Sequence, residues 1–225
     1  MRHLVGFGNR RCGSVELLTH IDLRHSGLLQ LYCSAAFSAL AAEKKAFLEH
    51  DPRALYPSDA SVFSAATFEL GGPHSRTHPS GTPYRHQAAG WSILTALGSY
   101  SSMRGGHIIL WDLGLVVSFP VGSSILIPTG LVRYSFVTVR PNERRYSLLQ
   151  WAGSGIPRWF RNGKRSDVEF AVNATREEHV AREERRQAAH AEALDLFPIE
   201  AELPDDCDMS LPFMWEENAA RKNTD

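Results

Sequence analysis

The residues of this chain that could bind a metal ion are mainly histidines, and several lie close together in the sequence. His74, His78 and His86 fall in one short segment, and His107 follows a pair of glycines further along. Imidazole is a common ligand of transition metals. One hypothesis is therefore a site built from His78, His86 and His107. The local cluster of His74, His78 and His86 has a spacing that matches no zinc motif. The alternative is a purely structural role for His107.

A second feature is a basic stretch with aromatic residues between positions 133 and 165. Its single acidic residue is Glu143, and its basic residues are Arg133, Arg140, Arg144, Arg145, Arg158, Arg161, Lys164 and Arg165. Trp151, Trp159 and Phe160 are interleaved with them. Cations beside aromatic rings suit the binding of single-stranded or flipped bases. We take Arg158, Arg161, Lys164 and Arg165 as candidate nucleic-acid contacts; the alternatives are that the stretch neutralises the acidic C-terminal segment and that Trp151 belongs to the core.

The overall composition is that of an ordinary globular protein and carries no strong functional signal. The net charge of -1 gives no global footprint for nucleic acid, so any such surface must be local. Cys12, Cys33 and Cys207 form no CxxC pair, which argues against a cysteine-based zinc site and suits a reducing compartment. No apolar run approaches the ~18 residues of a membrane span, and no signal-peptide pattern is present. We expect an intracellular protein, nuclear or cytoplasmic and not secreted.

The elements that must position these residues are expected to be mainly strands, with helices on either side. Residues 27–50 are rich in Leu, Ala, Glu and Lys and predict a helix. Seven short runs separated by Gly and Pro then predict strands, which indicates a sandwich or barrel. The runs are Ser61–Leu70, Trp91–Leu97, His107–Trp111, Leu115–Phe119, Ser124–Ile127, Leu131–Val139 and Arg145–Trp151. The fold class is α+β, mainly β.

A second helix is predicted after the strands, from about Thr175 to Leu196. Thr175 and Glu178 have the T-x-x-E spacing of a capping box, and the helix that follows has a mixed charged face. The segment from Pro198 onward is acidic and contains Pro204 and Pro212, which disfavour regular structure. The expected organisation is a helical region over 1–59, a β domain over 60–172, a helix over 173–197 and an acidic tail over 198–225.

Several motifs, in a consistent order, resemble one known family. They are Gly105-Gly106-His107 through Leu113, Phe119-Pro120 through Pro128, Glu143-Arg144-Arg145-Tyr146-Ser147, Gln150-Trp151 and Arg158-Trp159-Phe160. Together they resemble a large fungal family of TET/JBP-like iron(II)/2-oxoglutarate dioxygenases, many of them transposon-associated. The likeness extends from about residue 28 to residue 200.

The resemblance implies a double-stranded β-helix, which is a cupin-like jelly roll, with flanking helices. It also implies iron(II), 2-oxoglutarate and dioxygen as reactants in members with intact sites. Characterised TET/JBP relatives oxidise the 5-methyl group of a pyrimidine base, which must leave the base stack. Such enzymes hold iron with two histidines and one carboxylate, a set that leaves open positions for the other ligands.

Carried over residue by residue, the family's motif indicates a degraded metal site. His78 falls on the first ligand, Ser80 on the carboxylate and Tyr134 on the second histidine, whereas Arg145 falls on the arginine that pairs with 2-oxoglutarate. The one H-x-D triplet, His20-Ile21-Asp22, lies far upstream, and we interpret it as a surface or helix-start pair. We therefore expect a catalytically inactive dioxygenase-like protein with doubtful metal binding. The alternative is an active dioxygenase acting on a modified base in DNA or RNA; an unrelated hydrolase is disfavoured because no GxSxG, P-loop or HExxH motif occurs.

Overall fold

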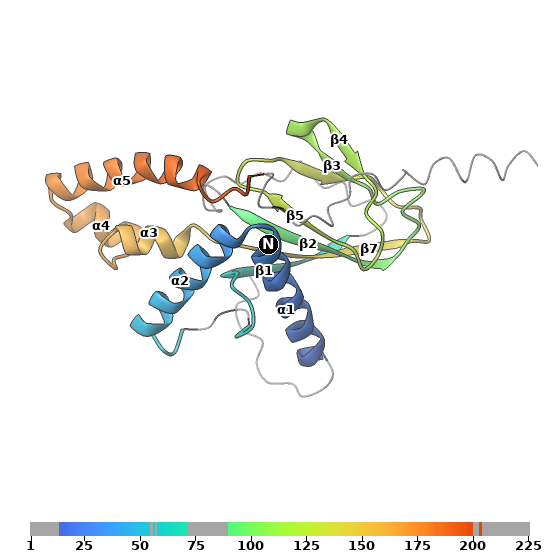
Figure 1. Ribbon diagram of the computed structural model, residues 1–225, viewed down its shortest axis with the longest axis horizontal. Helices are drawn as coiled ribbons and strands as arrows, with labels where there is room; N and C mark the ends of the chain where they lie inside the picture. Colours follow the sequence, from blue (N-terminus) through green and yellow to red (C-terminus); the bar gives the residue numbers. More distant parts are fainter. Residues whose placement is uncertain (1–13, 55, 57, 72–89, 200–202, 204–225) are drawn as a thin grey trace, which may run out of the picture.

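The computed structural model describes residues 14–54, 56, 58–71, 90–199 and 203. Within these residues the chain forms antiparallel β-sheets with flanking helices, as expected of an α+β protein. The helices contain more residues than the strands, so the described part of the chain is not mainly β. Figure 1 shows α1 and α2 on one side of the strands and α3, α4 and α5 beyond one end of them. Among the described residues, no helix has both the length and the apolar character that crossing a membrane requires.

Helices α1 (Ser14–Tyr32) and α2 (Ser34–His50) replace the single predicted helix of residues 27–50. The break lies at Cys33, whose backbone (φ −144°, ψ 60°) leaves the helical region. Across the break one buried stripe continues at helical spacing, and its members are Asp22, His25, Ser26, Leu29, Cys33, Ala36 and Leu40. The N-terminal part of this stripe is polar. The sequence prediction therefore began the helix too late, because it relied on the Leu-, Ala-, Glu- and Lys-rich composition that starts after Gly27.

Strands form in each of the seven predicted segments, and they pair into two antiparallel sheets. The four-stranded sheet has the order β1-β7-β2-β5, with bounds Ala65–Gly71, Arg144–Trp151, Trp91–Ser99 and Ser124–Pro128. The three-stranded sheet has the order β4-β3-β6, with bounds Leu115–Val117, Ile108–Leu110 and Tyr134–Phe136. A short 3-10 helix, η1 (Trp111–Leu113), connects β3 to β4.

The strand pairs are nested along the chain. The hairpin β3–β4 is innermost, β2 pairs with β5 around it, and β1 pairs with β7 outermost. Two further pairs, β2–β7 and β3–β6, join these ladders side by side. The pattern is that of one long antiparallel hairpin rolled up so that its strands divide between two sheets. The sheets are not closed into a continuous barrel within the described residues.

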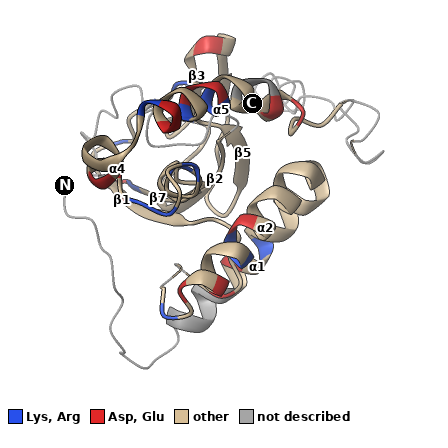
Figure 2. Ribbon diagram, turned by 90° about the vertical axis from the view of Figure 1, so that its left-hand side faces the viewer, with Lys and Arg blue, Asp and Glu red and all other residues tan. Residues whose placement is uncertain are grey.

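Each face of the four-stranded sheet covers a different core. One cluster lies between the two sheets and consists of Leu94, Ala96, Ile108, Leu110, Phe119, Ile127, Val132, Tyr134, Phe136 and Leu149. The other lies under α1 and α2 and consists of Leu29, Cys33, Ala36, Leu40, Val62, Phe63, Ile93 and Ala152. Figure 2 shows these two helices together against one side of the strands. Since successive residues of a strand point to opposite faces, β7 contributes to both regions.

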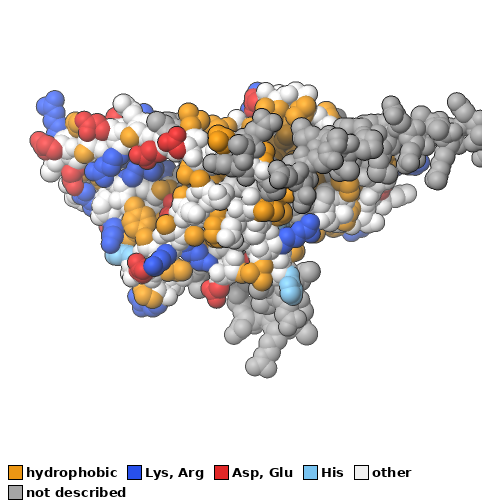
Figure 3. Space-filling model, in the orientation of Figure 1, with side chains coloured by type: hydrophobic (Ala, Val, Ile, Leu, Met, Phe, Trp, Pro, Cys, Tyr) orange, Lys and Arg blue, Asp and Glu red, His pale blue; other side chains and the backbone are white. Residues whose placement is uncertain are grey.

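The C-terminal part contains α3 (Gly155–Arg161), α4 (Asp167–Asn173) and α5 (Arg176–Leu194). The capping box predicted at Thr175 and Glu178 is confirmed, and a second one at Ser166 and Glu169 starts α4. Helices α3 and α4 follow the last strand, β7, and were not predicted from sequence. Charged side chains of both signs gather at the α5 end of the molecule (Figure 3).

Candidate functional site

Tyr134 and Arg145 come from different sheets, and both point into the core between them. Tyr134 on β6 is 1% exposed and Arg145 on β7 is 4% exposed, whereas the neighbouring Arg144 is exposed. Both residues contact Phe136: the Tyr134 ring packs edge-on against it, with centroids 5.7 Å apart, and Arg145 Cζ lies 3.5 Å from its centroid. The predicted arginine and the predicted ligand position thus meet at one aromatic ring. Sequence reasoning did not single out Phe136.

The Arg145 guanidinium has polar partners on its own strand and on β1. Its Nη1 donates a hydrogen bond to Ser147 Oγ at 3.2 Å, and Ser147 Oγ donates to Glu69 Oε2 at 2.5 Å. Its Nη2 lies 3.9 Å from Glu69 Oε2, the outer limit of an ion pair. These contacts follow from the register, which places Glu69 of β1 opposite Ser147 of β7. The resemblance assigns the carboxylate position to Ser80, eleven residues after Glu69, so it gave no reason to expect Glu69 here.

Burial lowers the pKa of Arg145, and the nearby Glu69, Tyr100 and Tyr134 act in the opposite direction. An arginine remains charged even so, because its ordinary pKa lies far above neutrality. The core between the sheets therefore holds a buried cation. A buried cation needs anionic or strongly accepting partners to offset its desolvation.

Tyr100 reaches this region because the double glycine leaves room for its ring. Gly106 has a φ of +71°, and a Cβ added there would meet Tyr100 Cε2 at 2.4 Å. The Tyr100 hydroxyl donates a hydrogen bond to the carbonyl oxygen of Phe119. A side chain at Gly106 would thus displace a ring that lies near Arg145. The Gly105-Gly106 motif acts here through packing.

Of the three ligand positions that the resemblance assigns, the described residues include Tyr134 alone. Among them, no group of three His, Cys, Asp or Glu side chains is placed to hold a metal ion. Tyr134 supplies a phenol, which in its neutral form is a poor ligand for iron(II). His107 is half-buried just before β3. The predicted positions His78 and Ser80, and His74 and His86 of the alternative histidine cluster, lie outside the described residues.

Asp22 of the H-x-D triplet is neither a surface residue nor a helix-start residue. It lies within α1, is 4% exposed, and its Oδ1 accepts a hydrogen bond from Gln150 Nε2 at 2.5 Å. Gln150 is on the helix-facing side of β7, opposite to the side that carries Arg145. The interpretation from sequence was therefore wrong, because Asp22 continues the buried stripe of α1. The carboxylate does not enter the region between the sheets.

Gln150 connects Asp22 to a buried histidine. The Nδ1 of His25 lies 2.5 Å from Gln150 Oε1, and its Nε2 lies 2.6 Å from Thr95 Oγ1. An amide oxygen only accepts, so His25 Nδ1 must carry a proton. In neutral His25 the Nε2 then accepts from Thr95, whose oxygen accepts in turn from Ser124 at 2.7 Å. The result is a one-way chain of hydrogen bonds from Ser124 to Asp22.

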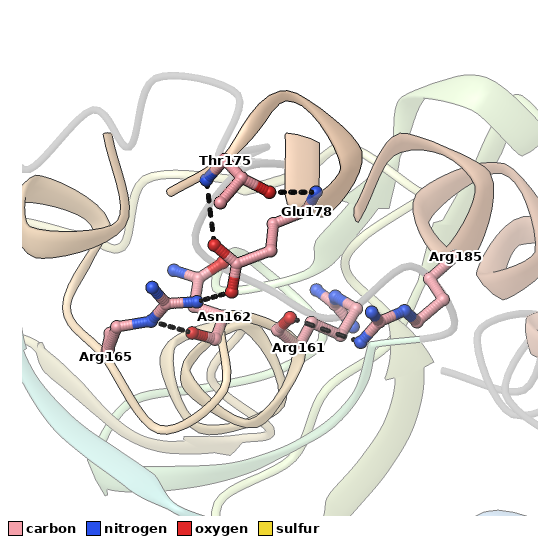
Figure 4. Close-up of polar contacts among 6 residues, drawn as sticks. All are labelled: Arg161, Asn162, Arg165, Thr175, Glu178 and Arg185. Atoms are coloured by element: carbon pink, nitrogen blue, oxygen red, sulfur yellow. Dashed lines mark hydrogen bonds and ion pairs between the residues drawn. The ribbon is translucent and has the colours of Figure 1, made fainter. Parts of the chain in front are cut away.

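The four candidate nucleic-acid residues lie on and after α3, and several have partners within the protein. Arg158 Nε lies 2.9 Å from Asp167 Oδ2, and Arg165 forms an ion pair with Glu178, which also caps α5 (Figure 4). Arg161 is half-buried; burial and the nearby Arg158 lower its pKa, while Glu43 opposes this. Lys164 Nζ lies 3.2 Å from His50 Nδ1. These contacts give the arginines a role in joining α3, α4 and α5.

Comparisons with known proteins give likenesses in structure only. No family model matches the chain, and no curated protein matches it. One solved structure that it resembles is "NgTET1 in complex with 5mC DNA", at 15% identity and a TM-score of 0.49, over 62% of this chain and 50% of that one. Another belongs to the prolyl 4-hydroxylases from Phytophthora capsici, at 14% identity and a TM-score of 0.33, over 68% of this chain and 56% of that one. The chain thus spans about half the length of these solved chains. With both TM-scores below 0.5, the case for a function depends on the residues of this chain.

Proposed function

We propose that this chain is a double-stranded β-helix protein of the TET/JBP-like dioxygenase type that no longer holds iron and is catalytically inactive. In this proposal Arg145 remains a binding group for the carboxylate of 2-oxoglutarate or of a related acid. The observation that carries the proposal is the meeting of Arg145 and Tyr134 at Phe136 between the two sheets. In this proposal the Arg145 guanidinium binds a carboxylate, and the Tyr134 phenol takes the position at which an active enzyme needs an imidazole.

The nested strand pairs support the double-stranded β-helix. In a jelly roll the first strand pairs with the last, and each later strand pairs further inward. The pairs β1–β7, β2–β5 and β3–β4 follow this rule. In the same proposal residues 60–172 contain the jelly roll, residues 1–59 and 173–197 are its helical flanks, and residues 198–225 form an acidic tail.

The donor chemistry supports inactivity. Iron(II) enzymes of this type need two imidazoles and a carboxylate to keep the metal and still leave positions open. The resemblance assigns His78, Ser80 and Tyr134 to these positions, and a hydroxyl and a neutral phenol cannot replace the missing ligands. A jelly roll can lose these ligands and stay folded, because its stability comes from apolar strands such as those around Leu94 and Ile108.

Anaerobic titration with iron(II), followed by a 2-oxoglutarate decarboxylation assay, tests the proposal. The natural protein should show no stoichiometric iron binding and no turnover. The double variant Ser80→Asp, Tyr134→His should gain iron binding. The alternative function, an active dioxygenase on a modified base in DNA or RNA, requires turnover by the natural protein. Iron-dependent decarboxylation without any substitution would therefore overturn inactivity.

A further inference from the structure

Among the described residues, the acidic side chain that interacts with Arg145 is Glu69. Glu69 lies on β1, an edge strand of its sheet, opposite Ser147, which is two residues from Arg145 on the same face of β7. Its carboxylate reaches Arg145 in two ways, through the Ser147 hydroxyl and directly at 3.9 Å. The Glu69 carboxylate thus takes the position beside Arg145 that the carboxylate of a bound ligand would otherwise occupy.

We propose that Glu69 weakens the binding of acidic ligands at Arg145 by competing with them for the guanidinium. The proposal rests on the proposed function only in assigning carboxylate binding to Arg145. A ligand carboxylate that approaches the guanidinium meets the negative charge of Glu69, so it must either displace Glu69 or bind against repulsion. The natural chain therefore binds 2-oxoglutarate weakly.

The N–H groups of Arg145 are not all used by the described residues, which favours such an exchange. A guanidinium has several N–H groups, yet within the described part of the chain Arg145 donates a hydrogen bond to Ser147 alone. Its direct approach to Glu69 is too long for a hydrogen bond, and a well-formed arginine–carboxylate pair is shorter and bidentate. The pair is thus incomplete, and a ligand carboxylate could make better contacts than Glu69 does.

The two partners also differ in their freedom to move. The side chain of Arg145 is 5% exposed and packs over Phe136, which keeps the guanidinium in place. The side chain of Glu69 is 23% exposed, so water reaches its carboxylate. Glu69 is therefore the partner that can turn away when a ligand arrives. The loss of its charge should leave a fixed, buried cation with no acidic partner among the described residues.

The test is a calorimetric titration of the protein with 2-oxoglutarate, in a metal-free buffer with a chelator so that iron binding does not enter the result. Glu69→Gln keeps the size of the side chain and removes its charge, and we expect it to bind 2-oxoglutarate at least about tenfold more tightly than the natural protein. Glu184→Gln makes the same charge change on an exposed position of α5 and should leave the affinity unchanged. The double variant Glu69→Gln, Arg145→Lys should lose the gain, because lysine lacks the planar fork.

The outcomes of this titration bear on competition at Arg145 and not on catalytic inactivity. A tighter Glu69→Gln variant, with the gain lost in the double variant, supports competition at Arg145. Equal affinity of Glu69→Gln and the natural protein, or no measurable binding by either while both unfold cooperatively, overturns it. An equal gain from Glu184→Gln would also overturn it, because net charge would then explain the effect. Catalytic inactivity is judged separately by the iron titration and can fail while the competition stands.

Discussion

The two faces of β7 hold two buried polar clusters that differ in how completely their groups are bonded. On the helix-facing side, Gln150 uses both ends of its amide, and His25 uses both ring nitrogens. On the side between the sheets, the described residues offer Arg145 one hydrogen-bond acceptor, Ser147, and its counter-ion Glu69 lies 3.9 Å away. The positions are five residues apart on one strand.

This difference indicates two different roles. A fully bonded buried network fixes one arrangement of its members and costs much when one member is removed. An incompletely bonded buried cation contributes little to stability, because its desolvation is poorly offset. We therefore interpret the Gln150 cluster as the set of hydrogen bonds that fixes α1 to the sheet. We interpret the Arg145 cluster as a candidate ligand-binding site.

The largest effect is expected from Gln150→Leu. This substitution keeps the bulk but leaves Asp22 and His25 without their shared partner inside the protein. We expect the free energy of unfolding to fall by about 3 kcal/mol, since each buried group left unbonded costs on the order of 1–3 kcal/mol. Urea denaturation followed by circular dichroism measures the change. Gln187→Leu on the exposed face of α5 is the matched control and should change stability by less than about 0.5 kcal/mol. Similar losses in both variants would refute the idea that the Gln150 hydrogen bonds fix α1 to the sheet.

A paired removal of hydroxyl groups compares the clusters directly. Thr95→Val deletes the hydroxyl that bonds His25 and Ser124, and it should cost about 1–2 kcal/mol. Ser147→Ala deletes the hydroxyl between Arg145 and Glu69, and it should cost less than about 1 kcal/mol because water can reach Glu69. The same denaturation experiment measures both. If Ser147→Ala proved the more destabilising, the contrast between the clusters would be reversed.

The free energy of unfolding should depend on pH partly through the protonation of His25. Burial lowers its pKa below the ordinary 6.5; Arg24 acts in the same direction, while the Gln150 hydrogen bond and Asp22 oppose the shift. The unfolded chain therefore takes up a proton at a higher pH than the folded protein does. The stability contributed by neutral His25 is complete above about pH 6.5 and is lost as the pH falls from there toward the folded pKa, by up to about 1.4 kcal/mol per pH unit.

Denaturation at pH 7.5, 6.5 and 5.5 measures this slope. The His25→Gln variant should be less stable at neutral pH but should lose less stability on acidification than the natural protein. The exposed His20 gives the control, because His20→Gln should keep the slope of the natural protein. An unchanged slope in His25→Gln would show that other groups cause the pH dependence.

The smallest stability effect is expected at Arg145. Arg145→Met replaces a buried, incompletely paired cation by an apolar side chain of similar length, and the free energy of unfolding should change by no more than about 1 kcal/mol. Binding of 2-oxoglutarate to the Glu69→Gln background should nevertheless disappear. If the free energy of unfolding fell by 3 kcal/mol or more, Arg145 would stabilise the fold as strongly as Gln150 does.

The sequence by itself determined much of the β architecture. The seven strands were predicted because apolar and β-branched runs alternate with Gly and Pro, and local patterns of this kind depend on near neighbours only. The capping box at Thr175 was predicted for the same reason. Helices α3 and α4 were missed because both are short and α4 begins with a capping box that was not recognised in Ser166-Asp167-Val168-Glu169.

Only the tertiary structure decided which polar residues meet. Arg145 and Tyr134 were identified from sequence, but their shared contact with Phe136 depends on how two sheets face each other. The pairing of Glu69 with Ser147 depends on the register of β1 and β7, and Gln150 reaches Asp22 across 128 positions of the chain. Such contacts follow from strand register and sheet packing, which no local pattern of residues specifies, because a shift of one residue reverses the face of every side chain.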